Sequence, residues 1–342
     1  MNLCMANFSY SAIVALLSFS LSACGGGGPA AVTSATQIPV ATASSSYAIT
    51  AAASALTLIN GLRQGAGLTA AVDNDALDKA ASNHLAFLVV NQLVTDAAYL
   101  RGLVEGILGG HYEMPGKQGY TGKSPQDRAT FSGYSGPVTE LVSLGAVSGA
   151  DCVTSLENSA YHLIGLIAPL VDIGVGFNIG NGSGNVCAVE LGVPATTVGK
   201  LPVDGSLVVY PYSGQMAVTP IFYNQAEIPV PVPDILVAGH PVAVSLYSQS
   251  APSLAGSDIV VHSFSMVQAN GTPISARLLT TPGVTSDGPD LRADSAIMGA
   301  GYIVLIPANP LAPNMVHTVK FSAIVKGRAV AKSWSFTTGT GA

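Results

Sequence analysis

Three side chains that can bind a metal or transfer a proton lie close together in this sequence: His111, Glu140 and His162. They are conspicuous because the chain has only 6 His, and charged residues make up only 9% of it. Two neutral imidazoles that converge on a cleft can bind a divalent metal such as zinc, with a carboxylate as third ligand or as the partner that fixes a tautomer. Without a metal, the same groups could form a general acid/base pair, since imidazole titrates near neutral pH.

No nucleophile motif accompanies these three groups. The sequence has no Gly-x-Ser-x-Gly segment, no His-Glu-x-x-His segment and no reactive cysteine in reach of them. The set is therefore open to three interpretations: a binding or metal site, an acid/base site, or a buried hydrogen-bonded network that only holds the walls of a cleft together.

The composition is that of an exported protein. Gly and Pro are abundant, at 38 and 21 residues, while Lys and Arg number only 13, so the surface must be built largely from small and uncharged polar residues. The formal net charge is −6, and no stripe of basic residues could neutralise a run of phosphates. Nucleic acid is thus excluded as an expected partner.

The N-terminus has the features of a targeting segment. Residues 1–62 contain no charged side chain, and the apolar run Ser11–Leu21 is too short to cross a bilayer, for which about 20 residues are needed. The run ends at Leu21-Ser22-Ala23-Cys24, which resembles the lipobox of bacterial lipoproteins. The resemblance implies a signal peptide over 1–23, acylation of Cys24 and a flexible tether over 24–46. It also implies a lipid anchor in the bacterial cell envelope, in the outer membrane rather than the inner one because Gly25 follows the cysteine.

Two cysteines remain for the folded part of the chain. The lipoprotein resemblance implies that Cys4 leaves with the signal peptide and that Cys24 is acylated, so Cys152 and Cys187 would form an even pair in an oxidising compartment. A disulfide between them would close a loop of about 35 residues and contribute about 3 to 4 kcal/mol. Two buried thiols are the alternative.

Residues 47–194 show both helical and strand patterns. Apolar residues at helical spacing predict a helix over 47–61 and a second one that starts at Asp73 or Asn74 and carries His84 as a packed residue. A short helix should begin at Ser124, where Pro125 follows the cap. Two apolar strands over 173–179 and 186–191 are predicted to form a hairpin.

Landmark residues in this segment occur in a family-like order: Asn60-x-x-Arg63, Gly67-Leu68, Ala81-x-x-His84, His111, Ser124-Pro125-x-Asp127-Arg128, Gly133-Tyr134, Glu140, Asn158-Ser159-x-Tyr161-His162 and Ile173-Gly174-Val175-Gly176. They resemble the bacterial branch of the CAP superfamily of cysteine-rich secretory, antigen 5 and pathogenesis-related proteins. The resemblance implies an α-β-α sandwich with a cleft lined by two His and two acidic residues. It places His111, His162 and Glu140 there, with Glu157 and Glu113 as the nearest substitutes for the second acidic residue.

Residues 200–342 lack helical periodicity. Proline-punctuated segments alternate with strand patterns, which predicts a β-sandwich, and the stretch that ends in Ser333-Trp334-Ser335-Phe336 resembles bacterial immunoglobulin-like domains. His240, His262 and His317 lie on or beside these strands without acidic residues at metal-ligand spacing, so we expect them to be structural.

The sequence therefore predicts an α+β protein with a CAP domain over 47–194 and an all-β sandwich over 200–342. Its expected function is binding rather than catalysis. The resemblance allows a small apolar ligand such as a lipid or sterol, and zinc or another divalent metal, in the cleft around His111, Glu140 and His162. The alternatives are a hydrolase that acts on peptide or cell-wall material, and an adhesive or structural protein with a cell-surface partner.

The lipid anchor can be tested by labelling. Cells that express the full chain should incorporate radiolabelled palmitate into it, and the Cys24→Ser chain should carry no label because its acylated thiol is absent. Equal labelling of the two chains would contradict the anchor.

Overall fold

The computed structural model describes residues 46–179, 185–194, 201–204 and 206–341. The expected signal peptide, the tether, Cys24 and the tip of the predicted hairpin lie outside the described residues. All described residues belong to one compact unit. None of the helices in these ranges combines the length and the hydropathy needed to span a membrane. The protein is mixed α/β with a large share of β structure, as the sequence predicts.

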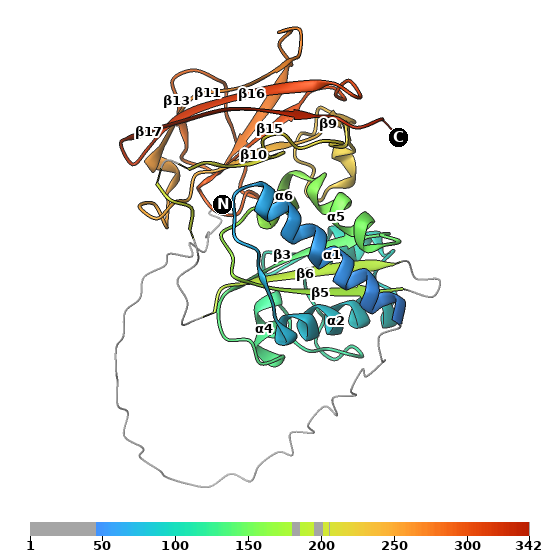
Figure 1. The fold of residues 1–342 in the computed structure, drawn as a ribbon. Helices are drawn as coiled ribbons and strands as arrows, with labels where there is room; N and C mark the ends of the chain where they lie inside the picture. The colour runs from blue at the N-terminus through green and yellow to red at the C-terminus, as the bar shows by residue number, and fades with distance from the viewer. Residues whose placement is uncertain (1–45, 180–184, 195–200, 205, 342) are drawn as a thin grey trace, which may run out of the picture. The chain divides into compact units, whose positions relative to one another are not determined.

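A four-stranded sheet forms the centre of the N-terminal half (Figure 1). Its order is β1 (Val72–Asp73), β5 (Asp172–Asn178), β6 (Val186–Gly192) and β4 (Val138–Leu144). β5 runs parallel to β1 and antiparallel to β6, and β6 runs antiparallel to β4. The predicted hairpin is thus the β5–β6 pair. A separate two-stranded ribbon consists of β2 and β3, at Leu103–Val104 and Ile107–Leu108.

Helices cover both faces of this sheet (Figure 1). One face packs against α1 (Ser46–Gly65), α5 (Gly149–Glu157) and α6 (Ala160–Leu166). The other packs against α2 (Asp75–Val90) and α4 (Pro125–Phe131), and the short α3 spans Ala97–Arg101. The expected caps are present, because Asn74 accepts from the first amides of α2 and Ser124 forms a capping box with Asp127 at α4.

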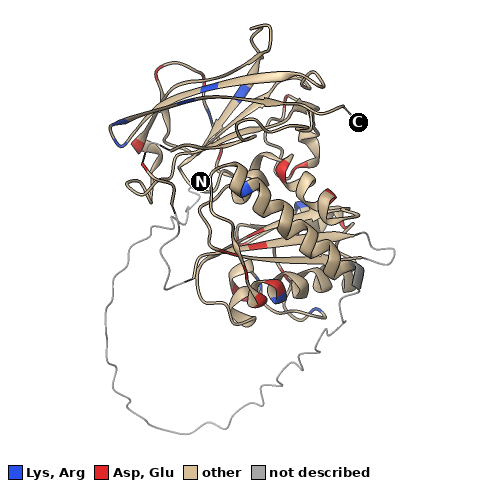
Figure 2. Ribbon diagram, viewed as in Figure 1, with Lys and Arg blue, Asp and Glu red and all other residues tan. Residues whose placement is uncertain are grey.

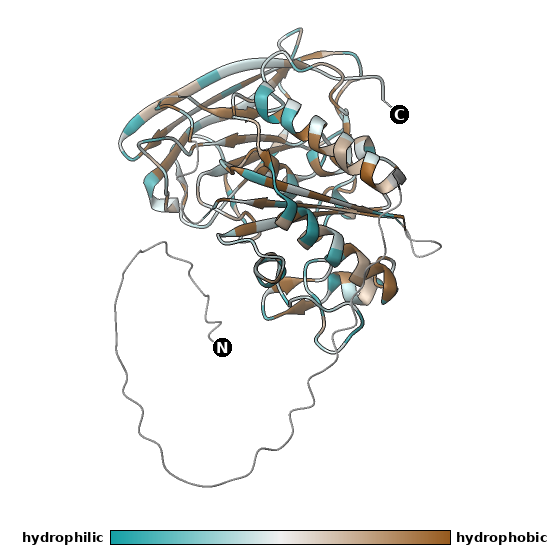
Figure 3. Ribbon diagram, turned by 60° about the horizontal axis from the view of Figure 1, so that its bottom comes forward, coloured by the Kyte–Doolittle hydropathy of each residue, from teal (hydrophilic) through white to brown (hydrophobic). Residues whose placement is uncertain are grey.

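The two faces of β5 differ in side-chain size. Ile173, Val175 and Phe177 point into the core shared with α1, α5 and α6. The alternate positions are Gly174 and Gly176, and a Cβ at Gly174 would lie 2.2 Å from the backbone of α2. Glycine is therefore required for α2 to pack directly on the sheet. Figure 3 shows hydrophobic residues in both the strands and the helices.

The predicted disulfide is present. Cys152 of α5 is bonded to Cys187 of β6, with a Cα–Cα distance of 6.1 Å. The bond fastens α5 to the central sheet, and α5 in turn provides one wall of the cavity described below. This pairing agrees with folding in an oxidising compartment.

The C-terminal half is a sandwich of two sheets. The first has the order β14-β12-β15-β10-β7 and the second β13-β11-β16-β17. In chain order the strands are β7 Val208–Tyr210, β8 Ile221–Phe222, β9 Ala238–Gly239, β10 Val242–Ser245, β11 Ile259–Gln268, β12 Ala276–Thr280, β13 Thr285–Ser286, β14 Arg292–Ala293, β15 Tyr302–Pro307, β16 Val316–Val325 and β17 Arg328–Thr337. β8 and β9 pair separately, and two 3-10 turns, η1 and η2, span Asn224–Ala226 and Gly256–Asp258.

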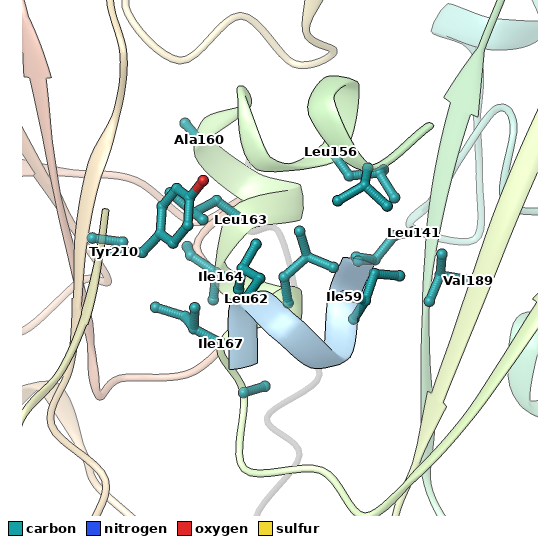
Figure 4. Packing of buried hydrophobic residues seen from close by; sticks show 14 of the residues in the cluster. Ile59, Leu62, Leu141, Leu156, Ala160, Leu163, Ile164, Ile167, Val189 and Tyr210 are labelled. Atoms are coloured by element: carbon teal, nitrogen blue, oxygen red, sulfur yellow. The ribbon is translucent and has the colours of Figure 1, made fainter. Parts of the chain in front are cut away.

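The five-stranded sheet of this sandwich is buried on both faces. One face contributes Val209, Val244 and Ile303 to a core with the second sheet, where Phe321 and Trp334 lie. The opposite face belongs to the same core as α1, α5 and α6. Figure 4 shows the ring of Tyr210 beside Ala160, Leu163 and Ile164 of α6. The segments expected as two domains therefore share one continuous hydrophobic core.

Candidate functional site

A cavity of about 450 Å³ lies where the helices of the N-terminal half meet the β8–η1 segment. This volume falls in the range of small-molecule sites, about 300 to 1,000 Å³. The lining comes from the segment around β3, from β4, α5 and the start of α6, and from the stretch that follows β8. The residues that the argument below uses are His111, Ser143, Asp151, Asn158, His162, Tyr223 and Glu227.

His111 and His162 face each other across this cavity. Their ring centroids are 6.5 Å apart, and the side chains are 23% and 24% exposed. His111 lies just after β3, whereas His162 lies in the first turn of α6, just after its cap Ser159. The fold thus brings together the two imidazoles that the sequence singles out.

Glu140 supports His111 from beneath the cavity. Its Oε1 lies 3.0 Å from Nδ1 of His111, and its Oε2 accepts a hydrogen bond of 2.6 Å from Arg128. Burial opposes ionisation of this carboxyl, but the positive charge of Arg128, together with the hydrogen bond to His111, holds the pKa of Glu140 well below its ordinary value. Glu140 is therefore a carboxylate, and it fixes the orientation of the His111 ring.

A second buried pair extends this network. Nδ1 of His84 lies 3.2 Å from Glu113, and its Nε2 lies 2.8 Å from the carbonyl oxygen of Gly110, one residue before His111. Glu113 also accepts a bond of 2.6 Å from the backbone amide of Thr121. His84 is packed in α2, as expected, but it also braces the loop that carries His111. Glu113 belongs to this buried layer and does not line the cavity.

Glu190 adds a protonated carboxyl to the same layer. It lies opposite Glu140 in the β4–β6 ladder and is fully buried. Burial, together with the charge of Glu140, raises the pKa of Glu190 well above its ordinary value. The layer beneath His111 therefore holds a charged Arg128–Glu140 pair beside a neutral Glu190. Figure 2 shows how few other charges the fold carries.

The acidic group beside His162 is Glu227 and not Glu157. Glu157 accepts a hydrogen bond of 2.7 Å from the hydroxyl of Tyr210 and does not line the cavity. Glu227, directly after η1, accepts bonds of 2.8 Å from the backbone amides of both Ala160 and Tyr161. It also accepts from the hydroxyl of Ser159 and lies 3.6 Å from Nδ1 of His162. No local sequence signal marks Glu227, which is 65 residues away from His162.

The neighbours of His162 keep its ring neutral. Burial of most of the ring, and then the repulsion that a protonated His111 would exert, lowers the pKa of His162 to about 3. Burial also raises the pKa of Glu227 to about 7, against the opposing effect of its hydrogen bonds. Ser159, His162 and Glu227 do not form a nucleophilic triad, because the Ser159 hydroxyl donates a hydrogen bond directly to Glu227 while its oxygen contacts Nδ1 of His162. In a triad the imidazole lies between the serine and the acid.

The side chains present do not fit a zinc site. Such a site needs at least three protein ligands, but Glu140 and Glu227 lie on the Nδ1 sides of the two rings and are held by Arg128 and by α6. Within the described residues, no three His, Cys, Asp or Glu side chains are arranged to hold a metal ion. His111 and His162, which we expected as metal ligands, therefore have no third protein ligand among the described residues.

The three other His lie away from the cavity. His240 and His317 are buried in the C-terminal half, and His262 pairs with Asp287 at 2.7 Å on its exposed side.

No family model and no curated protein matches this chain. Among solved structures, an outer surface protein from Borrelia burgdorferi is similar over 41% of this chain and 89% of its own length. The two share 20% sequence identity with a TM-score of 0.32. A likeness at this level decides neither the fold nor the function of this chain.

Glu227→Gln should change how stability depends on pH. The folded protein holds the Glu227 proton up to a pH of about 7, whereas the unfolded chain releases it near 4.5. The folded state thus binds more protons in this window, and the wild-type free energy of unfolding should fall relative to the variant as pH rises through it. The expected difference is on the order of 3 kcal/mol.

Urea unfolding of both proteins from about pH 4 to about pH 8 measures this difference. Glu105→Gln, at a side chain that is 77% exposed, is the control for exchanging a carboxyl for an amide. If the free energy of unfolding changes with pH in the same way for wild type and Glu227→Gln, the pKa of Glu227 is not raised in the folded protein.

Proposed function

We propose that this protein is a lipid-anchored envelope protein that binds a small molecule in the cavity between His111 and His162. The observation that carries the proposal is the placement of the two imidazoles, 6.5 Å apart and partly exposed, on a cavity of about 450 Å³. Pockets of this size with a few convergent polar groups are the usual form of a ligand site.

The landmark residues support a CAP-type assignment for the N-terminal half. The α-β-α layering around His111, Glu140 and His162 agrees with what the resemblance implies. The C-terminal half is assigned as an immunoglobulin-like module on its two packed sheets and strand spacing. In this proposal the module also completes the cleft, since Glu227 takes the place of the second acidic residue.

The sequence and the disulfide together support a location in the bacterial cell envelope. The segment that ends at Cys24 has the pattern of a lipoprotein signal, and the Cys152–Cys187 bond suits a compartment outside the cytoplasm. We place the protein on the outer membrane of a bacterial envelope, anchored through acylated Cys24.

Binding is favoured over hydrolysis by the state of the candidate groups. Ser159 is only 5% exposed and is engaged by Glu227 and His162, so it is not available as a nucleophile. Glu140 is tied to Arg128 and does not reach the cavity as a free base. A purely adhesive role would leave the cavity unused.

The proposal is tested with the full chain carrying Cys24→Ser, which stays unacylated. Neutral sugars and decanoate are each titrated while the ¹⁵N signals of the imidazoles are followed by NMR. At least one of these should shift the signals of His111 and His162. The His111→Ala/His162→Ala variant should bind that compound at least tenfold more weakly, a loss of about 1.4 kcal/mol.

His262→Ala is the matched control, because this imidazole lies outside the cavity. It should leave the affinity unchanged. If none of the compounds shifts the two imidazoles, or if the double variant binds as tightly as its parent, the proposed site is not a ligand site.

A further inference from the structure

The proton on the His111 ring can be placed from its partner. Because Glu140 is ionised, it can only accept a hydrogen bond, so a neutral His111 must donate from Nδ1 to it. The Nε2 atom then carries a lone pair. Among the described residues no hydrogen bond engages this atom, and His111 lines the cavity. His111 therefore presents an acceptor to a ligand.

The same reasoning applies to His162. The single hydroxyl proton of Ser159 goes to Glu227 when that carboxyl is ionised. The contact of 2.8 Å between Ser159 and Nδ1 of His162 must then use a proton on Nδ1. Nε2 of His162 is thus the second acceptor that faces the cavity. Glu227 sets this tautomer although it lies outside the helix that carries His162.

Two residues of the lining each contain a buried polar atom that has no hydrogen-bond partner among the described residues. The Oδ1 of Asn158 is buried without a hydrogen-bond partner, since its amide nitrogen donates to the carbonyl oxygen of Ile221. The hydroxyl of Ser143 is likewise buried and without a partner, in a residue that is only 2% exposed. Both residues line the cavity. A buried polar atom without a partner costs about 1 to 3 kcal/mol, so a ligand group that donated a hydrogen bond to either atom would be favoured.

The charges around the cavity disfavour ionic ligands. None of the described lining residues is Lys or Arg, so an anion would meet neutral hydroxyl donors but no fixed positive charge. A buried cation needs an uncommitted counter-charge. Glu227 and Glu140 are both committed to other groups, and Asp151 lies on the exposed side of α5. A neutral ligand therefore suits the cavity better, and hydroxyl groups are one class of neutral donor that the two imidazole acceptors can bind.

An exposed aromatic ring completes the lining. Tyr223 lies directly before η1, is 63% exposed and lines the cavity. An exposed aromatic ring beside a cavity whose lining combines apolar and polar groups can stack against the C–H face of a sugar ring while the hydroxyls bond to the polar atoms.

We propose that the cavity binds a neutral, hydroxyl-rich ring of the chemical class of a sugar unit, held by His111, His162 and Asn158 with Tyr223 as stacking platform. This assignment rests on the proposed function and replaces the apolar ligand that the family resemblance implies. A site whose polar atoms accept hydrogen bonds from the hydroxyl groups of a ligand discriminates strongly against analogues that lack those groups.

The test uses the full Cys24→Ser chain at about pH 8, where Glu227 is ionised because its pKa is about 7. Glucose, galactose, mannose, N-acetylglucosamine and their disaccharides are titrated by calorimetry, with glucuronate, glucose 6-phosphate and decanoate as comparison. At least one neutral sugar should bind at least tenfold more tightly than either anionic sugar. Tyr223→Ala should weaken that binding at least fivefold.

Phe131→Ala is the matched control. Phe131 is 46% exposed and does not line the cavity, so its loss should not change the affinity. Equal or tighter binding of glucuronate or glucose 6-phosphate overturns the assignment. Binding of decanoate without any sugar overturns it too, but leaves the proposed function standing. If neither a sugar nor any other compound binds, both the sugar assignment and the proposed small-molecule function are wrong.

Discussion

The hydrogen bonds of Glu227 are the interaction on which the candidate site depends. This carboxylate takes up the first backbone amides of α6 and the hydroxyl of the cap residue Ser159, all in a buried position. A helix N-terminus stabilises a negative charge, so the contact offsets part of the cost of burying it. It also joins the two halves of the chain at the point where the cavity forms. The orientation and the proton position of His162 follow from this contact.

The other wall of the cavity is held by a different carboxylate. Glu140 pairs with Arg128 and orients His111, and both charged groups are fully buried. Burying such a pair is costly unless its remaining hydrogen-bonding atoms are satisfied, and Arg128 meets part of this need by donating to the backbone carbonyl of His111. Removing either partner would leave an uncompensated charge in the core. The two imidazoles are therefore positioned independently, one by the central sheet and one by the segment after β8.

The sequence was sufficient for features that depend on local pattern or on elimination. The helix caps at Asn74 and Ser124, the β5–β6 hairpin and the Cys152–Cys187 bond all follow from turn chemistry, periodicity and compartment. Glu113 and Glu157, expected in the cleft because they lie near the two His in sequence, bond to other partners instead, and nearness along the chain does not determine where a side chain points. Glu227 could not be found in this way, since its contact with Ser159 spans 68 residues and arises only when the sandwich packs on α6. The CAP and immunoglobulin-like assignments remain predictions.

The protonation of the His162 ring tests this account most directly. The ¹⁵N chemical shifts of its two nitrogens, measured on the full Cys24→Ser chain at about pH 8, report which nitrogen carries the proton. Burial and the Ser159–Glu227 contact predict a neutral ring with its proton on Nδ1 and a free lone pair on Nε2. A ring protonated on Nε2, or a charged imidazolium, would contradict the described coupling between Glu227 and the cavity.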